Sequence, residues 1–345
     1  MSWVLDAPRM QPTRRALITG TLFALVAGLM WGLVFVAPTL LHEYPAPLLA
    51  AGRYLAFGLI ALPLAWLGRA RLAELTRADW LAALKLAAVG NLLYYLCLAA
   101  AIQHAGVPLP TMIIGTLPVV IAVCSNLRGS ATVRLRDGHL PWARLAPSLL
   151  LMAAGIACVN AAELQHLRAS GGTDIARHAG GALLAVGALA CWTWYPIRNA
   201  DWLRTHSHRS PGTWATAQGV ATLPLAALGY AAWWAWTAWG AGGGADPQLP
   251  FGPRPWAFVG LMLAIGLFAS WLGTLCWNEA SQRLPPALAG QLIVFEALSA
   301  LTYAYLLRGS WPQAPALLGV LLLVAGVGWA LRQGPTSAAA DVHAR

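Results

Sequence analysis

The chain has 345 residues, of which 59% are hydrophobic and 10% are charged, against about 25% charged in ordinary soluble domains. So little charge cannot cover the surface of a soluble fold of this size, and much of the surface is therefore expected to face lipid. The formal net charge of +10 lies between apolar runs rather than along a groove with interleaved aromatics, which excludes nucleic acid as the expected partner.

Ten apolar runs of about 20 residues, the length that crosses a hydrocarbon core, follow one another along the chain. The first run follows Arg14 and Arg15 and is longer than the apolar region of a signal peptide, which favours an uncleaved span. The sequence therefore predicts an all-α, polytopic membrane protein with ten transmembrane helices. The predicted spans are 16–38, 47–68, 80–103, 107–127, 143–162, 179–198, 212–239, 256–282, 285–307 and 312–332.

The first three spans carry a small-residue stripe and the first polar candidates. Small residues four apart in the first span, among them Gly20 and Gly28, predict close packing against another helix. Arg53 in the second span is either a counter-charge or anion contact inside the bundle, or a side chain that snorkels to the surface. The third span carries three polar or aromatic groups that either line a cavity or join helices: Asn91, Tyr94 and Tyr95.

Trp192 and Tyr195 in the sixth span are further candidates for a cavity wall. The eighth span has a stripe of small and polar residues, Gly266, Ser270, Thr274 and Asn278, which either packs a helix or forms a polar pathway wall.

The last candidates are two acids and an amide. Glu279 lies close to the end of the eighth span, where a solvated role is favoured. Gln291 and Glu296 lie in the ninth span, Glu296 near its middle. A carboxyl at that depth is either a coupling-proton or cationic-substrate site, or a structural group bonded to a neighbouring helix.

Two segments in different halves of the chain nearly repeat each other: Leu62–Gly68 reads LPLAWLG and Leu223–Gly229 reads LPLAALG. The same offset carries Trp31 onto Trp192. A second, slightly larger offset carries Cys97 onto Cys276 and Gln103 onto Gln282. An internal duplication in a membrane protein is the usual build of a secondary transporter.

Five spans in each half is an odd number, so the second half must enter the membrane from the opposite side, and the repeat is predicted to be inverted. The candidate charges do not repeat: Arg53 aligns with Trp214, and Glu296 with Leu117.

Most of the 22 Lys and Arg residues fall on one side when the N-terminus is placed in the cytoplasm. The positive-inside rule then predicts that both termini are cytoplasmic. The predicted divisions are a cytoplasmic segment 1–15, a first five-helix repeat 16–165, a periplasmic connection 166–178, a second five-helix repeat 179–332 and a cytoplasmic tail 333–345.

No enzyme motif is present: the chain has no G-x-S-x-G, no P-loop, no H-E-x-x-H and no carboxylate pair within one span. The five cysteines all fall inside apolar runs without paired spacing, which argues against disulfides and against a zinc site. We therefore expect no catalytic residue, no cofactor and no metal. Uphill transport would draw on a gradient or an exchange partner.

Several short motifs occur in the order and spacing of a known family. They are Ala27–Gly32 (AGLMWG), Arg53-Tyr54, Gly115–Val119 (GTLPV), Ala280-Ser281-Gln282, Phe295-Glu296, Gly319, and Ala325–Val327 (AGV). With these motifs the chain resembles the EamA-like, ten-span branch of the drug/metabolite transporter superfamily over residues 16–332, closest to an uncharacterised bacterial inner-membrane subgroup. The resemblance implies movement of small metabolites, amino acids prominent among them, by alternating access around a central cavity.

The sequence thus favours a bacterial inner-membrane secondary transporter that moves a small organic metabolite, an amino acid or a related compound, in the direction of export. The alternative is a non-transporting helical membrane scaffold or assembly subunit. The expected partners are the metabolite and the lipid bilayer, with a homodimer as a further possibility.

Overall fold

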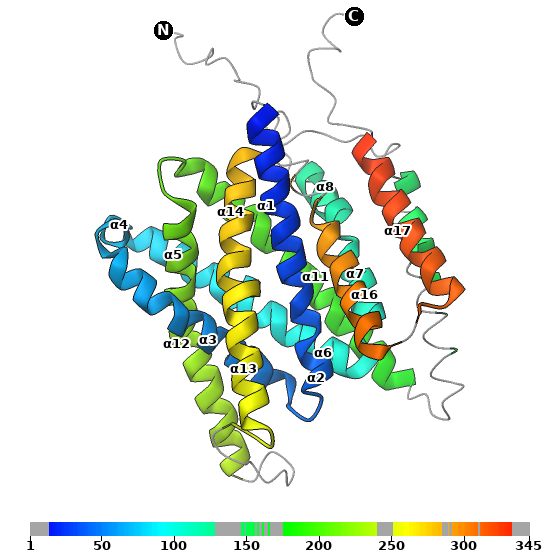
Figure 1. Ribbon diagram of the computed structural model, residues 1–345, viewed down its shortest axis with the longest axis horizontal. Coiled ribbons are helices and arrows are strands. Elements are labelled where there is room, and N and C mark those ends of the chain that lie inside the picture. The colour runs from blue at the N-terminus through cyan, green and yellow to red at the C-terminus, as the bar shows by residue number, and fades with distance from the viewer. Residues whose placement is uncertain are drawn as a thin grey trace, which may run out of the picture.

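The computed structural model describes residues 14–127, 175–239, 251–284, 292–309 and 311–332, with Ala289 and short pieces between 146 and 165. Every regular element in this part of the chain is a helix, and the helices pack side by side as a bundle (Figure 1). The predicted all-α class is confirmed.

The helices follow one another with short breaks, several of which divide one long helical segment into pieces. Their bounds are α1 Arg14–Gly32, η1 Leu33–Phe35, α2 Ala37–Leu40, α3 Ala46–Leu67, α4 Arg69–Ala73, α5 Arg77–Leu86, η2 Ala87–Leu93, α6 Tyr94–Ala105, α7 Pro108–Gly115, α8 Leu117–Leu127, α11 Ile175–Thr205, α12 Pro211–Ala238, α13 Pro255–Ile265, η3 Gly266–Leu272, α14 Gly273–Arg283, α16 Val294–Arg308 and α17 Ala314–Arg332.

Five helical segments in the described residues are long and apolar enough to cross a membrane: Arg14–Leu40, Ala46–Leu67, Arg77–Ala105, Ile175–Leu203 and Pro255–Arg283. Shorter apolar helices and α12, of 28 residues, complete the bundle. The fifth predicted span, 143–162, is described only in part, with a shorter apolar helix at Ala146–Gly155. The count of ten spans therefore stays a prediction.

The junction between the third and fourth predicted spans depends on a glycine. Helix α6 ends at Ala105, and Gly106 follows with a φ of 74°. Pro108 then opens α7. Glycine adopts positive φ without a steric penalty, and proline is well suited to a first helical turn. Gly106 and Val107 are therefore enough to separate these helices.

The small-residue stripe of α1 packs closely against the end of α14 and against α16. A Cβ atom placed on Gly20 would lie 2.8 Å from a side-chain carbon of Leu284, and one on Gly32 would lie 2.7 Å from the Cβ of Ser299. No side chain fits there without displacing its neighbour. The predicted packing role of this stripe is confirmed.

Helices α3 and α12 pack against each other and run in opposite directions. Gly58 of α3 lies against Leu223, whereas Gly219, earlier in α12, lies against Ala61, later in α3. The two near-identical heptapeptides are in these helices, Leu62–Gly68 at the end of α3 and Leu223–Gly229 within α12.

Other contacts between the halves come in matched sets. Helix α1 packs on α14, and its counterpart α11 packs on α6; α3 packs on η3, and α12 packs on η2. Both η2 (Ala87–Leu93) and η3 (Gly266–Leu272) are π-helical turns of the same length. The offset that carries Cys97 onto Cys276 also carries the first turn onto the second, residue for residue.

Candidate functional site

A small cavity lies between the two halves, at the level of the two π-helical turns. Its volume is about 10 Å³, which leaves room for about one water molecule. In this structure the cavity is therefore too small for an organic solute. It is lined by Trp31, Val34, Arg53, Tyr54, Asn91, Tyr94, Trp192, Ala269, Ser270, Thr274 and Glu296; we call it the central cavity.

Glu296 lies in the first turn of α16 and is 1% exposed. One of its oxygens accepts a hydrogen bond from the Tyr94 hydroxyl at 3.3 Å, and the other accepts from Nε1 of Trp192 at 3.1 Å. Two donors from different helices thus hold this acid.

Arg53 projects from α3 into the same cavity and is 4% exposed, so its side chain does not snorkel to the surface. Its Nε donates to Oγ of Ser270 at 3.0 Å. The guanidinium carbon lies 4.8 Å from the ring centroid of Tyr54 and 4.4 Å from that of Tyr95, distances at which a cation is attracted by a ring face. The Nη1 atom is buried and has no hydrogen-bond partner among the described residues.

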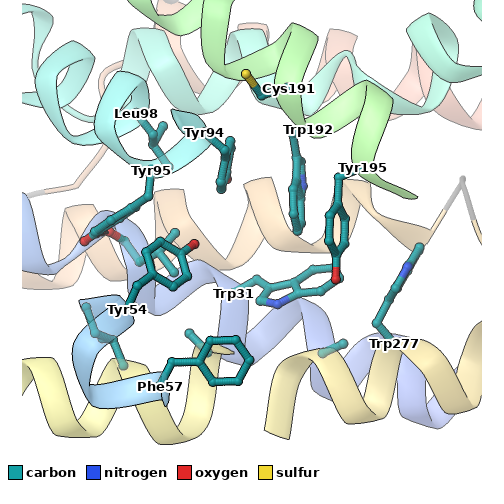
Figure 2. Packing of buried hydrophobic residues seen from close by; sticks show 14 of the residues in the cluster. Trp31, Tyr54, Phe57, Tyr94, Tyr95, Leu98, Cys191, Trp192, Tyr195 and Trp277 are labelled. Atoms are coloured by element: carbon teal, nitrogen blue, oxygen red, sulfur yellow. Dashed lines mark hydrogen bonds between the residues drawn. The ribbon is translucent and has the colours of Figure 1, made fainter. Parts of the chain in front are cut away.

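A row of aromatic rings forms one wall of the site (Figure 2). The rings of Tyr94 and Trp192 stack with centroids 4.6 Å apart, and Tyr195 stacks on the other side of Trp192 at 5.0 Å. Trp31 meets Trp192 edge-on, also at 5.0 Å. The two tryptophans that the sequence repeat relates are therefore in contact.

The two π-helical turns each contribute one polar side chain. Asn91 of η2 donates to Oγ1 of Thr222 at 3.1 Å, and Ser270 of η3 accepts from Arg53. Ser270 and Thr274 line the central cavity, which places part of the predicted stripe of the eighth span at the site.

Five of the nine predicted site residues line the central cavity: Arg53, Asn91, Tyr94, Trp192 and Glu296. Tyr95 and Tyr195 flank it, through Arg53 and Trp192 respectively. Glu279 lies elsewhere and forms an ion pair with Arg283, one turn further along α14. Gln291 lies outside the described residues.

The sequence reasoning missed Asn199 and Gln218, which lie at the centre of a second buried polar group. Oδ1 of Asn199 accepts from Nε1 of Trp214 at 2.8 Å and from Nε2 of Gln218 at 3.2 Å, while its amide donates to Asn278 at 2.9 Å. The Tyr195 hydroxyl donates to Gln218 at 2.7 Å. We call these five residues the Asn199 cluster. The available signal was Gln218, an amide within the seventh predicted span, because such a group needs a partner inside a membrane; Asn199 lies just beyond the sixth predicted span.

Among the described residues, no three His, Cys, Asp or Glu side chains lie close enough together to hold a metal ion.

A bundle of apolar helices around a small, buried polar cavity defines a multi-pass membrane protein of the transporter type. Comparison with known proteins agrees. Residues 18–138 match the EamA-like transporter family, and the chain is 53% identical to "Inner membrane protein YtfF" of Escherichia coli (strain K12) over 321 residues, 92% of this chain and 97% of that protein.

The chain belongs to the EamA-like transporter family, as the sequence motifs had indicated, and is a multi-pass inner-membrane protein. The relative is named as a membrane protein rather than as an enzyme. The chain is also similar to a protein of known crystal structure, with a TM-score of 0.60 and 17% sequence identity. The match covers 90% of this chain and 96% of the chain in that structure. At that identity it supports the fold alone.

Proposed function

We propose that this protein is a secondary transporter that exports a small organic metabolite, an amino acid or a related compound, by alternating access around the central cavity. The observation that carries the proposal is the cavity itself. It holds a buried Arg53 and a buried Glu296 between the two halves of a membrane-spanning bundle. Ionisable groups at such depth are costly and mark a substrate or ion pathway.

The proposed architecture is ten spans in two inverted five-helix repeats, with both termini in the cytoplasm. The antiparallel course of α3 and α12 supports the inversion, because equivalent helices of a non-inverted repeat would point the same way. The matched contacts and the equivalent placing of the two π-helical turns support the duplication. Helix α1 begins and α17 ends on the same side of the bundle (Figure 1), as an even number of spans requires.

Two ion pairs close the opposite ends of the α3–α12 pair. Arg254, before α13, pairs with Glu43, before α3. Arg209, before α12, pairs with Glu74, after α4. At both ends the first half supplies the acid and the second half supplies the base.

Hollows lie at both ends of the bundle, outside the central cavity. One, of about 410 Å³, is lined by residues such as His42 and Gln103; the other, of about 230 Å³, is lined by residues such as Gly68 and Trp271. Access to the central cavity from either end needs helix movement, and opening an end separates the acid and the base of its ion pair. The described conformation therefore fits an occluded intermediate of the proposed cycle.

The test is transport in reconstituted vesicles with a panel of metabolites, with and without a proton gradient. We expect wild-type protein to move at least one solute and the charge reversals Glu74→Arg and Arg209→Glu to slow it singly. Their combination is expected to restore part of the rate, because the pair is re-formed in reverse. A protein that moves no solute and is stabilised by none would instead be the scaffold that the alternative function describes, because a ligand that binds only the folded form must raise its stability.

A further inference from the structure

The guanidinium of Arg53, a residue that lines the central cavity, has spare donor capacity. An arginine side chain carries five N–H donors. Here Nε is used by Ser270, and the ring faces of Tyr54 and Tyr95 flank the plane of the group. Nη1 is buried without a partner among the described residues. A buried charged donor left unpaired is unfavourable, and its partner is therefore sought among molecules that enter the cavity.

Glu296 does not supply that partner. It lines the same cavity, but its two oxygens accept from Tyr94 and Trp192, and no ion pair joins it to Arg53 in the described part of the chain. Glu296 is therefore held by two neutral donors, whereas Arg53 keeps an N–H donor without a partner among the described residues. A residue of the cavity wall therefore keeps an unused N–H donor of a permanent cation.

We propose that the substrate is a monocarboxylate whose carboxylate accepts a hydrogen bond from Nη1 of Arg53. This inference rests on the proposed function and names its substrate class. Guanidinium is planar, permanently charged and well matched to carboxylate oxygens. A single negative charge fits best because Arg53 is the one basic residue among the described residues that line the cavity, so a second negative charge would have no cation to pair with. The rest of the molecule lies against the rings of Trp31 and Trp192.

The guanidinium is held in place before the substrate binds, which makes binding selective for carboxylates. Ser270 holds Nε, and Tyr54 and Tyr95 restrict rotation of the group, so little side-chain entropy is lost when a carboxylate binds. A site built around a charged donor rejects an analogue that lacks the matching charge, because its own polar group is then left unpaired. Amides of the same molecules, in which a neutral group replaces the carboxylate, are therefore poor ligands.

The experiment compares matched acid and amide pairs on the purified full-length protein and in vesicles. The probes are L-threonine and L-threoninamide, L-phenylalanine and L-phenylalaninamide, and lactate and lactamide, with inorganic phosphate as the dianionic arm. We expect at least one carboxylate to raise the melting temperature and to be transported, and its amide to bind roughly 10- to 100-fold more weakly, as for one charge-assisted hydrogen bond.

The variant Arg53→Gln should bind acid and amide alike, and Arg53→Lys should keep part of the preference. Arg69→Gln, which removes the same charge from the exposed surface of α4, should retain the full preference. If Arg53→Gln does not fold, the acid-to-amide ratio of wild-type protein still decides.

The proposal is overturned if the amides bind as well as the acids, if Arg53→Gln keeps the preference, if phosphate binds better than every carboxylate, or if none of the carboxylates binds. Transport of a neutral or cationic solute with no response to carboxylates would overturn this inference and leave the proposed function in place. Absence of transport for any solute would count against the proposed function itself.

Discussion

Arg53 on α3 and Trp214 on α12 are at equivalent places in the two halves, related by the offset that aligns the two heptapeptides, yet their surroundings differ. Arg53 faces the central cavity with one donor unpaired. Trp214 is completely buried, donates to Asn199 and stacks on Trp202 with ring centroids 3.5 Å apart. At equivalent helix positions, the first half thus has a charged residue at a cavity, and the second half has a buried tryptophan with its hydrogen bond satisfied.

The neighbours of the two residues differ in the same way. The Asn199 cluster continues through Trp202 to Asp79 on α5, since Nε1 of Trp202 donates to that carboxylate at 2.8 Å. Asp79 in turn caps the start of α5 together with Thr76. On this side of the molecule, hydrogen bonds between buried side chains join the helices. Under the proposed duplication, the two halves can therefore keep their packing at this pair of positions while only one of the two carries a charge.

The largest expected effect comes from neutralising the acid of the central cavity. Glu296→Gln keeps the size of the side chain and an acceptor for Trp192, so the protein should fold while transport falls by about 100-fold or is lost. Transport in vesicles measures this, with thermal stability as the check on folding. The matched variant Glu279→Gln lies outside the cavity and should retain most of the activity. Normal transport by Glu296→Gln across the pH range would remove this acid from the mechanism.

A second effect, on both stability and transport, is expected where the central cavity meets the Asn199 cluster. Tyr195 stacks on Trp192 at the cavity and bonds to Gln218 in the Asn199 cluster, and a Cβ on Gly90 would overlap its ring. Gly90→Ala is expected to destabilise the protein by about 1–3 kcal/mol through overpacking and to slow transport as well. Gly260→Ala is the control, because nothing lies within 4 Å of the added Cβ. Equal melting temperatures for the two variants would contradict the predicted clash.

Asn199→Ala should lower the stability of the protein without changing its preference for acids over amides. Its removal leaves the donors of Trp214 and Gln218 unpaired, which is expected to cost about 1–3 kcal/mol of stability. The acid-to-amide preference of the folded protein should not change, because the cluster does not line the cavity. Unfolding in detergent and ligand-dependent stabilisation measure the two quantities. A changed preference at unchanged stability would show that the two regions are not distinct.

The smallest effect concerns the ion pair at one end of α3. Burial raises the pKa of Glu43, but the hydrogen bond and the charge of Arg254 outweigh it, so the pKa lies below its ordinary value of 4.5. A depressed folded-state pKa contributes stability above the unfolded pKa, and that contribution is lost as the pH falls through the folded value. Wild-type protein should lose this small contribution as the pH falls below about 4.5.

Glu43→Gln should lack that acid-dependent step, and thermal melts between neutral and acidic pH compare the two proteins. The effect is small because the pair is partly exposed and screened by solvent. A step of equal size in both proteins would assign the acid sensitivity to another group.

Some site residues could be predicted because their signal is local. Arg53 and Glu296 stand out as charges within apolar runs, and the stripe of Ser270 and Thr274 follows from helical spacing. Glu279 was a weaker candidate, and its pairing with Arg283 also has a local signal, an acid and a base one turn apart on one helix. Asn199 and Gln218 were missed because a single amide in a span does not indicate its partner.

The sequence by itself determined the class of molecule and the residues whose charge is out of place in lipid, and it predicted the duplication. Span length, hydropathy and the presence of a charge are properties of a segment, so they can be read along one chain. Only the tertiary structure decided which of two equivalent positions became a site. Ser270, which holds Nε of Arg53, lies in the other half of the chain, and Trp214 is satisfied by an asparagine on another helix. Whether a buried donor is paired or free depends on helices that meet only when the bundle closes.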